Sequence, residues 1–388
     1  MRIGILCHPS YGGSGVLATE LGIALAGRGH EVHFFSHDLP FRLPDAGARV
    51  EFHRIEVTAY PVFRYPPYTQ SLAGHLADLC RDAPLDIVHA HYAIPHAVAA
   101  ILCRDIVGGR RPRVVTTLHG TDITLLGLDR AFYEVTRHAI RKSDAVTAVS
   151  QFLRDATFEK FRPEAPVRVI PNFVDAERFS PALRDPAIRA RYARPDEVLV
   201  GHLSNFRPVK RIPDVIRTFH RIQRKVPARL VMMGDGIELE PARHLAAELG
   251  IADRVSFLGA VTEVAQILAQ LDLFLLPSEH ESFGLAALEA MACGVPVLAS
   301  RAGGLPEVIE DGVSGALCEV GDSACMAEMA LAILRAPGRL EALRAAARRR
   351  AAEVFPKERV VGLYEDLYAE VLREDECRSG APARSAGS

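Results

Sequence analysis

The chain has 388 residues, 49% of them hydrophobic, and a formal net charge of −2. This length predicts two or three domains with large cores, and the near-neutral charge gives no reason to expect nucleic acid or an acidic membrane as a partner. The seven cysteines include no Cys-x-x-Cys pair, which is typical of a reducing compartment. We therefore expect a cytoplasmic protein with no signal peptide and no membrane span.

Short apolar segments alternate with helical segments through the first half of the chain. This alternation predicts a doubly wound parallel sheet. The expected strands are 3–7, 31–36, 50–55, 86–90, 114–118, 145–149 and 167–170. The expected helices include 16–26, 71–80, 95–107 and 130–142.

A polar, proline-bearing stretch at 172–195 interrupts this pattern, and we interpret it as a linker between domains. The alternation then restarts, which predicts a second parallel α/β domain. Its expected strands are 198–203, 229–233, 255–258, 273–276, 295–298 and 315–318, with helices at 212–226 and 241–249 and a last helix at 358–372. The predicted division is a first domain of 1–172 joined by 356–377, a second domain of 173–355 and a disordered tail of 378–388.

A glycine-rich loop follows the first strand and reads Gly13-Ser14-Gly15-Val16-Leu17-Ala18. It fits the Gly-x-Gly-x-x-Ala fingerprint of dinucleotide-binding folds, with Asp38 at a suitable spacing for a ribose contact. An NAD-dependent enzyme is therefore one candidate. Against it, five residues separate Cys7 from Gly13, whereas the fingerprint places its first glycine directly after the strand.

Residues 278–315 carry the second candidate site. Glu281 lies in a loop between a strand and a helix, and Glu289 lies on that helix. The amides of Phe283, Gly284 and Leu285 lie at the start of the helix, where they can bind an anion. A helix rising about 1.5 Å per residue would separate the two glutamates by about 12 Å. A glycosidase pair needs about 5–9.5 Å, so that interpretation is poorer.

The spacing Glu281-x7-Glu289, followed by Ala-Cys-Gly-Val-Pro-Val and Gly-Gly-Leu-Pro-Glu, resembles the Glu-x7-Glu motif of retaining family 4 glycosyltransferases. The likeness covers nearly the whole chain. It implies the GT-B fold, in which two Rossmann-like domains face a cleft. It also implies that Glu281 faces the donor sugar, that Glu289 holds the nucleotide ribose and that His119 lines the donor-sugar pocket.

The same resemblance implies that Arg207 and Lys210, three residues apart in the loop after the strand 198–203, stabilise the leaving diphosphate. The loop containing Ser14 and Gly15 is then expected to close over the acceptor and the diphosphate. The chain contains no Asp-x-Asp motif, so we expect no metal and no other cofactor. The histidines of the segment 89–96 lack a nearby carboxylate or cysteine cluster, which disfavours a metal site there.

Four strings, at 9–15, 65–68, 89–96 and 117–124, resemble those family members that transfer N-acetylglucosamine (GlcNAc) from UDP-GlcNAc to L-malate at the start of bacillithiol synthesis. This resemblance implies acceptor contacts from Ser14, Tyr92, Thr117 and Asn205, and a homodimer is compatible with it. Three alternatives stay open: a family member that acts on inositol phosphate or another sugar, the NAD-dependent enzyme, and a nucleotide-sugar-binding regulatory protein without turnover.

Overall fold

The computed structural model describes residues 1–9, 12–43, 47, 49–57, 62, 64–109 and 111–379. The chain folds as two compact units. Unit 1 comprises Met1–Ile170 and the C-terminal segment from Glu358, and unit 2 comprises Pro171–Lys357. The sequence had placed the domain boundaries at 172–173 and 355–356. Most of the tail expected to be disordered, 380–388, lies outside the described residues.

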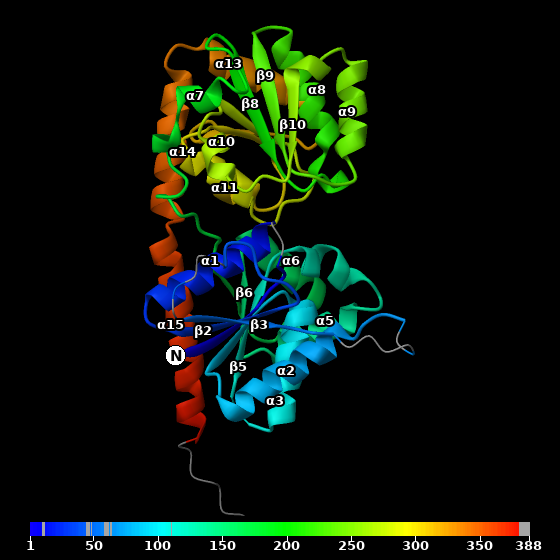
Figure 1. The fold of residues 1–388 in the computed structure, drawn as a ribbon, viewed down its shortest axis with the longest axis vertical. Coiled ribbons are helices and arrows are strands. Elements are labelled where there is room, and N and C mark those ends of the chain that lie inside the picture. Colours follow the sequence, from blue (N-terminus) through cyan, green and yellow to red (C-terminus); the bar gives the residue numbers. More distant parts are fainter. Residues whose placement is uncertain are drawn as a thin grey trace, which may run out of the picture. The chain divides into compact units, whose positions relative to one another are not determined.

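The core of unit 1 is a seven-stranded, parallel sheet with the order β3-β2-β1-β4-β5-β6-β7 (Figure 1). Because the strand order reverses between β1 and β4, the loops that follow these two strands diverge at one point of the sheet edge. The strands are β1 (Arg2–Leu6), β2 (Glu31–Ser36), β3 (Val50–Arg54), β4 (Ile87–His91), β5 (Arg113–Leu118), β6 (Ala145–Ala148) and β7 (Val167–Val169).

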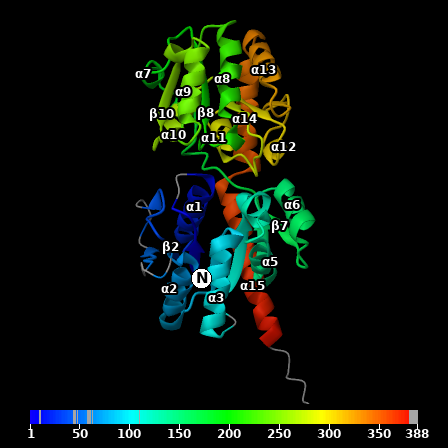
Figure 2. The same cartoon turned by 90° about the vertical axis from the view of Figure 1, so that its right-hand side faces the viewer.

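Helices cover both faces of this sheet. Helices α2 and α3 lie side by side (Figure 2). Gly22 of α1 faces Phe34 of β2 so closely that an added Cβ would lie 2.3 Å from the phenyl ring, so glycine is required for this packing. The helices are α1 (Gly13–Gly27), α2 (Tyr68–Asp82), α3 (Val98–Val107), α4 (Thr121–Thr124), α5 (Tyr133–Lys142), α6 (Gln151–Phe161) and α15 (Lys357–Ser379).

Helix α15, shown in red in Figure 1, belongs to unit 1 although it comes last in the chain. Its buried Tyr368 hydroxyl lies 2.7 Å from His89 Nδ1 of β4. Glu365 accepts a hydrogen bond from Arg28, after α1, and Glu370 accepts one from Arg168 of β7. The helix therefore crosses the sheet and joins elements from its two halves.

Unit 2 contains a six-stranded, parallel sheet with the order β10-β9-β8-β11-β12-β13. Here the reversal of strand order lies between β8 and β11. The strands are β8 (Val198–Leu203), β9 (Ala228–Met233), β10 (Val255–Gly259), β11 (Leu273–Leu276), β12 (Val297–Ser300) and β13 (Gly315–Cys318). The helices are α7 (Pro186–Arg189), α8 (Ile212–Gln223), α9 (Leu239–Glu248), α10 (Val264–Leu268), α11 (Leu285–Ala292), α12 (Leu305–Val308), α13 (Ser323–Arg335) and α14 (Arg339–Val354).

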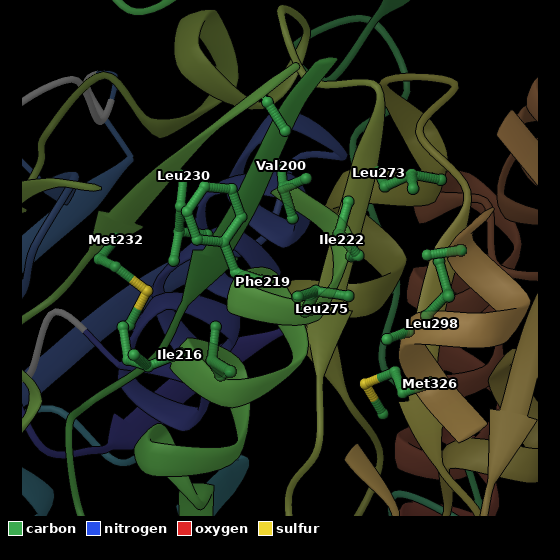
Figure 3. Close-up of a cluster of buried hydrophobic side chains, with 14 of the residues drawn as sticks. Val200, Ile216, Phe219, Ile222, Leu230, Met232, Leu273, Leu275, Leu298 and Met326 are labelled. Atoms are coloured by element: carbon green, nitrogen blue, oxygen red, sulfur yellow. The ribbon is translucent and has the colours of Figure 1, made fainter. Parts of the chain in front are cut away.

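The core of unit 2 forms where α8 packs on the sheet (Figure 3). Ile216, Phe219 and Ile222 recur every three residues on one face of α8, and all three are fully buried. They pack with strand residues such as Leu230 and Leu275. Burial of each such side chain contributes about 1.5–3 kcal/mol to folding.

The prediction of two parallel α/β sheets is confirmed, and the differences lie at element ends. Helix α1 begins at Gly13, inside the glycine loop, and not at 16. The helix expected at 95–107 is divided, because Ile94 is non-helical within the turn Ala93–Ala97 and α3 starts only at Val98. Helix α5 starts at Tyr133 and not at 130.

The stretch 172–195, expected to be a linker, packs on unit 2. The Arg184 and Arg189 guanidinium groups donate hydrogen bonds to backbone oxygens of residues 269–271. Among the residues that the structure describes, no helix combines the length and apolarity that crossing a bilayer requires.

Candidate functional site

The candidate site in unit 2 lies where its strand order reverses. The loop after β8 carries Arg207 and Lys210, and the loop after β11 carries Glu281. Since β8 and β11 are neighbours, both loops leave the same edge of the sheet. The Glu279 amide donates to the Val209 carbonyl oxygen at 2.8 Å, which joins the two loops directly.

Lys210 and Glu281 form an ion pair, with 2.6 Å between Nζ and Oε2. Their side chains are only 18% and 16% exposed, so water screens this pair less than a surface pair. Lys210 ends the short 3-10 turn Pro208–Lys210. The pair thus presents a positioned cation and a positioned carboxylate at the point of the sheet where ligands of open α/β folds bind.

Two glycines after β12 hold the Glu281 loop. The Gly304 amide donates to the Glu281 carbonyl oxygen at 2.8 Å. Gly303 has a φ of +56°, and a Cβ there would lie 1.9 Å from the same oxygen. A Cβ on Gly304 would lie 2.4 Å from the Ser282 carbonyl oxygen. The Gly-Gly-Leu-Pro-Glu string therefore serves close approach of two backbones.

Helix α11 starts directly after this loop. Gly284 precedes it with a φ of +99°, and Leu285 is its first residue. Phe283 is buried and its ring meets Phe355 edge-on, with 5.5 Å between centroids. The amides at this helix start are suited to an anion. Glu289, one turn further on, is 8% exposed and so lies mostly beneath the surface.

Two further predicted residues lie in the β8 loop and are exposed. They are Asn205 and Arg207. The Arg207 carbonyl oxygen accepts from the Lys210 amide at 2.9 Å, so the cation at 207 is attached to the turn that ends at 210. Because both cations lie in one loop, a single anionic ligand can contact both.

Sequence reasoning gave His202 no role, yet it braces this loop. Its Nδ1 lies 2.8 Å from the Leu275 carbonyl oxygen, and its Nε2 lies 2.7 Å from Ser204 Oγ. Burial lowers the pKa of His202 to about 4, so the ring is neutral near pH 7. Its position near the carboxyl end of a central strand was the signal that could have identified it.

In unit 1 the predicted residues lie in the loops after β1, β4 and β5. Gly15 is buried and Ser14 is half-buried, both in the first turn of α1. The dinucleotide-like string is therefore a helix start. Its first amides can bind an anion, whatever the ligand.

Tyr92 follows β4 with a φ of +90°, a value that is strained for a residue with a Cβ. Its amide donates to the Thr117 carbonyl oxygen at 2.9 Å. Its ring lies 5.5 Å from that of His8 and 5.1 Å from that of His119, measured between centroids. Strain of this kind costs about 1–3 kcal/mol and is concentrated at functional sites.

Five histidines surround this tyrosine loop, namely His8, His89, His91, His96 and His119. The His91 Nδ1 and His119 Nε2 atoms lie 2.9 Å apart, and the His8 and His96 rings have centroids 4.5 Å apart. Burial lowers the pKa of His89, His96 and His119 to about 3. Burial likewise lowers the pKa of His91 and His8. The cluster is therefore a set of neutral imidazoles near pH 7, able to donate or accept hydrogen bonds.

Asp122 ties the loops of this cluster together. Its carboxylate accepts hydrogen bonds from the amides of Gly120 and His119 and from that of Ala93 after β4. Burial raises the pKa of this carboxyl to about 6, although the backbone amides favour its charged form. Asp122 thus connects the loop that carries His119 with the loop that carries Tyr92.

Thr117 lies deeper than a direct acceptor contact needs. It is fully buried, and its Oγ1 lies 2.7 Å from His89 Nε2, 2.7 Å from Thr147 Oγ1 and 3.3 Å from the Tyr364 hydroxyl. Its side chain points into the packing of β4, β5 and β6 against α15. The Thr117 hydroxyl therefore links β4, β6 and α15, and its contact with an acceptor stays a prediction.

Comparison with known families gives two matches that together span most of the chain. Residues 11–178 match the family described as Glycosyltransferase Family 4. Residues 185–350 match the family described as Glycosyl transferases group 1.

The chain is 46% identical over 376 residues to N-acetyl-alpha-D-glucosaminyl L-malate synthase of Bacillus anthracis, with 97% of this chain and 98% of that protein covered. It is 30% identical to D-inositol 3-phosphate glycosyltransferase of Mycobacterium marinum, with 79% and 70% covered. Among solved structures, Anabaena Alr3699/HepE in complex with UDP and glucose superposes with a TM-score of 0.81 at 20% identity, covering 95% of this chain and 99% of that one. At this sequence identity the structural likeness supports the fold alone.

The contact between Gly303 and Glu281 predicts a stability difference between two glycine substitutions. Gly312 also has a positive φ, +74°, but a Cβ there would meet no atom within 4 Å. Gly312→Ala should therefore lower the free energy of unfolding only by the backbone cost, about 1–2 kcal/mol. Gly303→Ala should lower it by about 1–3 kcal/mol more, because the Glu281 loop must move. Urea unfolding of both variants is the measurement, and equal losses would contradict the close approach.

The neutral histidine cluster predicts acid sensitivity. A histidine whose pKa is lowered in the folded state binds its proton on unfolding, so folded-state stability falls as pH drops below the unfolded value of about 6.5. Each such proton contributes up to about 1.4 kcal/mol per pH unit. The urea midpoint should therefore decrease as the pH is lowered from about 6.5 to about 5, a range in which most carboxylates do not yet titrate. His89→Gln should flatten this slope and His244→Gln, at an exposed position, should not. A slope unaffected by His89→Gln would contradict the prediction.

Proposed function

The chain belongs to the family 4 glycosyltransferases, and on that basis we propose that it transfers GlcNAc from UDP-GlcNAc to the hydroxyl of L-malate with retention of configuration. The products are GlcNAc-malate and UDP, which makes this the first step of bacillithiol biosynthesis. One observation carries the proposal: the 46% identity to the Bacillus anthracis L-malate synthase extends over 97% of the chain.

The loops of unit 2 supply the donor side of this proposal. When the bond between the sugar C1 and the UDP oxygen breaks, negative charge develops on the diphosphate. Lys210 and Arg207, together with the amides at Phe283, Gly284 and Leu285, are suited to stabilise that charge. We assign Glu281 to the donor sugar, and Glu289 to the nucleotide ribose.

The proposed reaction proceeds on one face of the sugar. The malate hydroxyl oxygen bonds to C1 on the face that UDP leaves, and the hydroxyl proton passes to an oxygen of the departing diphosphate. No protein nucleophile is then needed. The protein has to position the two substrates and to stabilise charge, which the preorganised pair of Lys210 and Glu281 and the fixed helix start can do without reorganisation.

Unit 1 supplies most of the proposed acceptor side. Malate is a small dianion with one hydroxyl, so its site needs hydrogen-bond donors. The first amides of α1, the Ser14 hydroxyl and the Tyr92 ring with its neighbouring neutral imidazoles offer such groups. We assign Ser14, Tyr92 and Asn205 to the acceptor, with Gly15 giving close approach to the donor and His119 lining the sugar pocket. Thr117 supports this set from beneath.

We further propose that turnover needs no metal, because the sequence lacks Asp-x-Asp and Arg207 and Lys210 offer positive charge for the diphosphate. A cytoplasmic location, which rests on the sequence alone, completes the proposal, and a homodimer is compatible with it. A second candidate, an inositol phosphate acceptor, is favoured by the 30% identity to the Mycobacterium marinum inositol-phosphate enzyme. The NAD-dependent alternative is not part of the proposal, because both family matches are to glycosyltransferases.

Release of UDP from UDP-GlcNAc with a panel of acceptors tests the proposal. L-malate should support turnover, with GlcNAc-malate detected by mass spectrometry, and inositol phosphate should not. Turnover should survive EDTA. Faster turnover with inositol phosphate would overturn the acceptor while leaving the family assignment intact. Activity lost to EDTA and restored by magnesium or manganese would overturn metal independence.

Substitutions at the two proposed acceptor residues test the site itself. Tyr92→Phe and Asn205→Ala should each raise the apparent KM for malate about threefold to tenfold, the effect of one lost hydrogen bond, and should change the KM for UDP-GlcNAc less. Tyr192→Phe, on a tyrosine after α7 in unit 2, is the control and should change neither constant. If Tyr92→Phe and Asn205→Ala raised only the KM for UDP-GlcNAc, the acceptor assignment would be wrong.

A further inference from the structure

A group of possible metal ligands lies on the outer edge of the unit 1 sheet, on strands β2 and β3. In the parallel pairing, His33 stands opposite Glu51, and Phe35 stands opposite His53. Residues two apart along a strand share a face, so His33, Glu51 and His53 all lie on one face. Strand β3 is the edge strand of the sheet, and solvent can reach the group from that edge.

The donor atoms of these side chains have the spacing of one coordination shell. His33 Nδ1 lies 2.9 Å from His53 Nε2 and 3.4 Å from Glu51 Oε2. His53 Nε2 lies 3.9 Å from Glu51 Oε1. A tetrahedral zinc ion with bonds of about 2.0–2.1 Å separates its donors by about 3.3 Å. Small rotations of the half-buried His53 and the exposed Glu51 side chains would bring the three distances to this value.

A fourth residue prepares His33 for this role. Its Nε2 lies 3.0 Å from Glu31 Oε1, and Glu31 in turn accepts from Arg2 Nε at 3.1 Å. A carboxylate only accepts, so His33 Nε2 carries the proton and Nδ1 presents its lone pair toward His53 and Glu51. A carboxylate on the outer nitrogen is the usual second partner of a metal-bound histidine. Arg2 also lies 3.5 Å from His33 Nε2, where Glu31 offsets its charge.

An ion would lie where the two histidine rings now contact each other. Since His33 Nδ1 is the acceptor, His53 Nε2 donates the proton that joins the rings. Binding of zinc would replace that proton, which His53 can carry on Nδ1 instead or release to solvent. His33 is 2% exposed and gives a fixed anchor, whereas His53 at 22% and Glu51 at 65% can adjust.

We propose that His33, His53 and Glu51 bind one zinc ion, with water as the fourth ligand, and that this ion clamps edge strand β3 to β2. Two imidazoles and one carboxylate form a donor set that zinc commonly takes. Among the described residues, this is the one group of three or more such side chains whose ligand atoms lie within 4.8 Å of one another. Most of β3 is only half-buried or exposed, so the ion would add the attachment that burial does not supply.

Zinc titration of the full chain, stripped of metal and competed against a chelating dye, tests the proposal. One zinc should bind per chain, and it should raise the melting temperature. His53→Gln and Glu51→Gln should each weaken binding at least tenfold. Glu31→Gln, which leaves all three ligands in place, should weaken it about 10–100-fold, the range for outer partners of metal-bound histidine. His244→Gln, at an exposed histidine beside Glu248, is the matched control and should not affect binding.

Two results would overturn the proposal. One is zinc binding as tight in His53→Gln as in the unmodified chain. The other is a cobalt-substituted protein with a thiolate-to-metal absorption band, which would place the ion on cysteines. Melting of each variant without zinc shows that it is folded, so loss of binding cannot come from unfolding. Because the proposed clamp is structural, EDTA should lower the melting temperature of the zinc-loaded protein and leave the rate of UDP release unchanged. The melting temperature does not depend on which acceptor the enzyme uses.

Discussion

The ion pair between Lys210 and Glu281 is the interaction on which the unit 2 site depends. It joins loops that follow neighbouring strands β8 and β11, and its 2.6 Å contact is mostly shielded from solvent. Taking two charges partly out of water is favourable only when the geometry is held. The backbone supplies that geometry, because the amide of residue 279 bonds the β8 loop and Gly303 and Gly304 lie against the backbone of residues 281–282. A charged ligand at this point therefore meets a preorganised cation.

The predicted site residues of unit 1 are mostly neutral, in contrast to the charged residues of unit 2. The loops of unit 1 bring together neutral imidazoles, a strained tyrosine and a helix start. The buried carboxylate of Asp122 joins the loops after β4 and β5, and α15 contacts His89 of β4. Charged donors fix a diphosphate strongly, whereas neutral donors in a buried site discriminate by hydrogen-bond geometry. This contrast supports the proposal that unit 2 binds the donor diphosphate and that unit 1 supplies most of the acceptor contacts.

Much of this arrangement could be predicted from the sequence, because hydrophobic periodicity reports which segments are buried. The parallel strands were predicted in this way, and the motif placed Lys210 and Glu281 in loops at strand ends. The direct contact of these two side chains was not predicted, since 71 residues separate them and periodicity carries no information on pairing. Likewise, the resemblance implied that Thr117 contacts the acceptor, but the sequence did not indicate that Thr117 would bond to Tyr364 of α15. The start of α1 at Gly13 was not predicted, because glycine is unfavourable inside a helix and the glycine-rich string therefore indicated a loop.

A double-mutant cycle on Lys210→Ala and Glu281→Gln, read as kcat/KM for UDP-GlcNAc with L-malate, tests the central claim most directly. If the two residues act as one unit on the departing diphosphate and the sugar, Lys210→Ala should cost roughly 10²–10³-fold, the range for loss of one charge-stabilising group. The double variant should then lose far less than the product of the single losses. Single losses that multiply, or a Lys210→Ala variant within about threefold of the unmodified enzyme, equivalent to about 0.6 kcal/mol, would contradict this account.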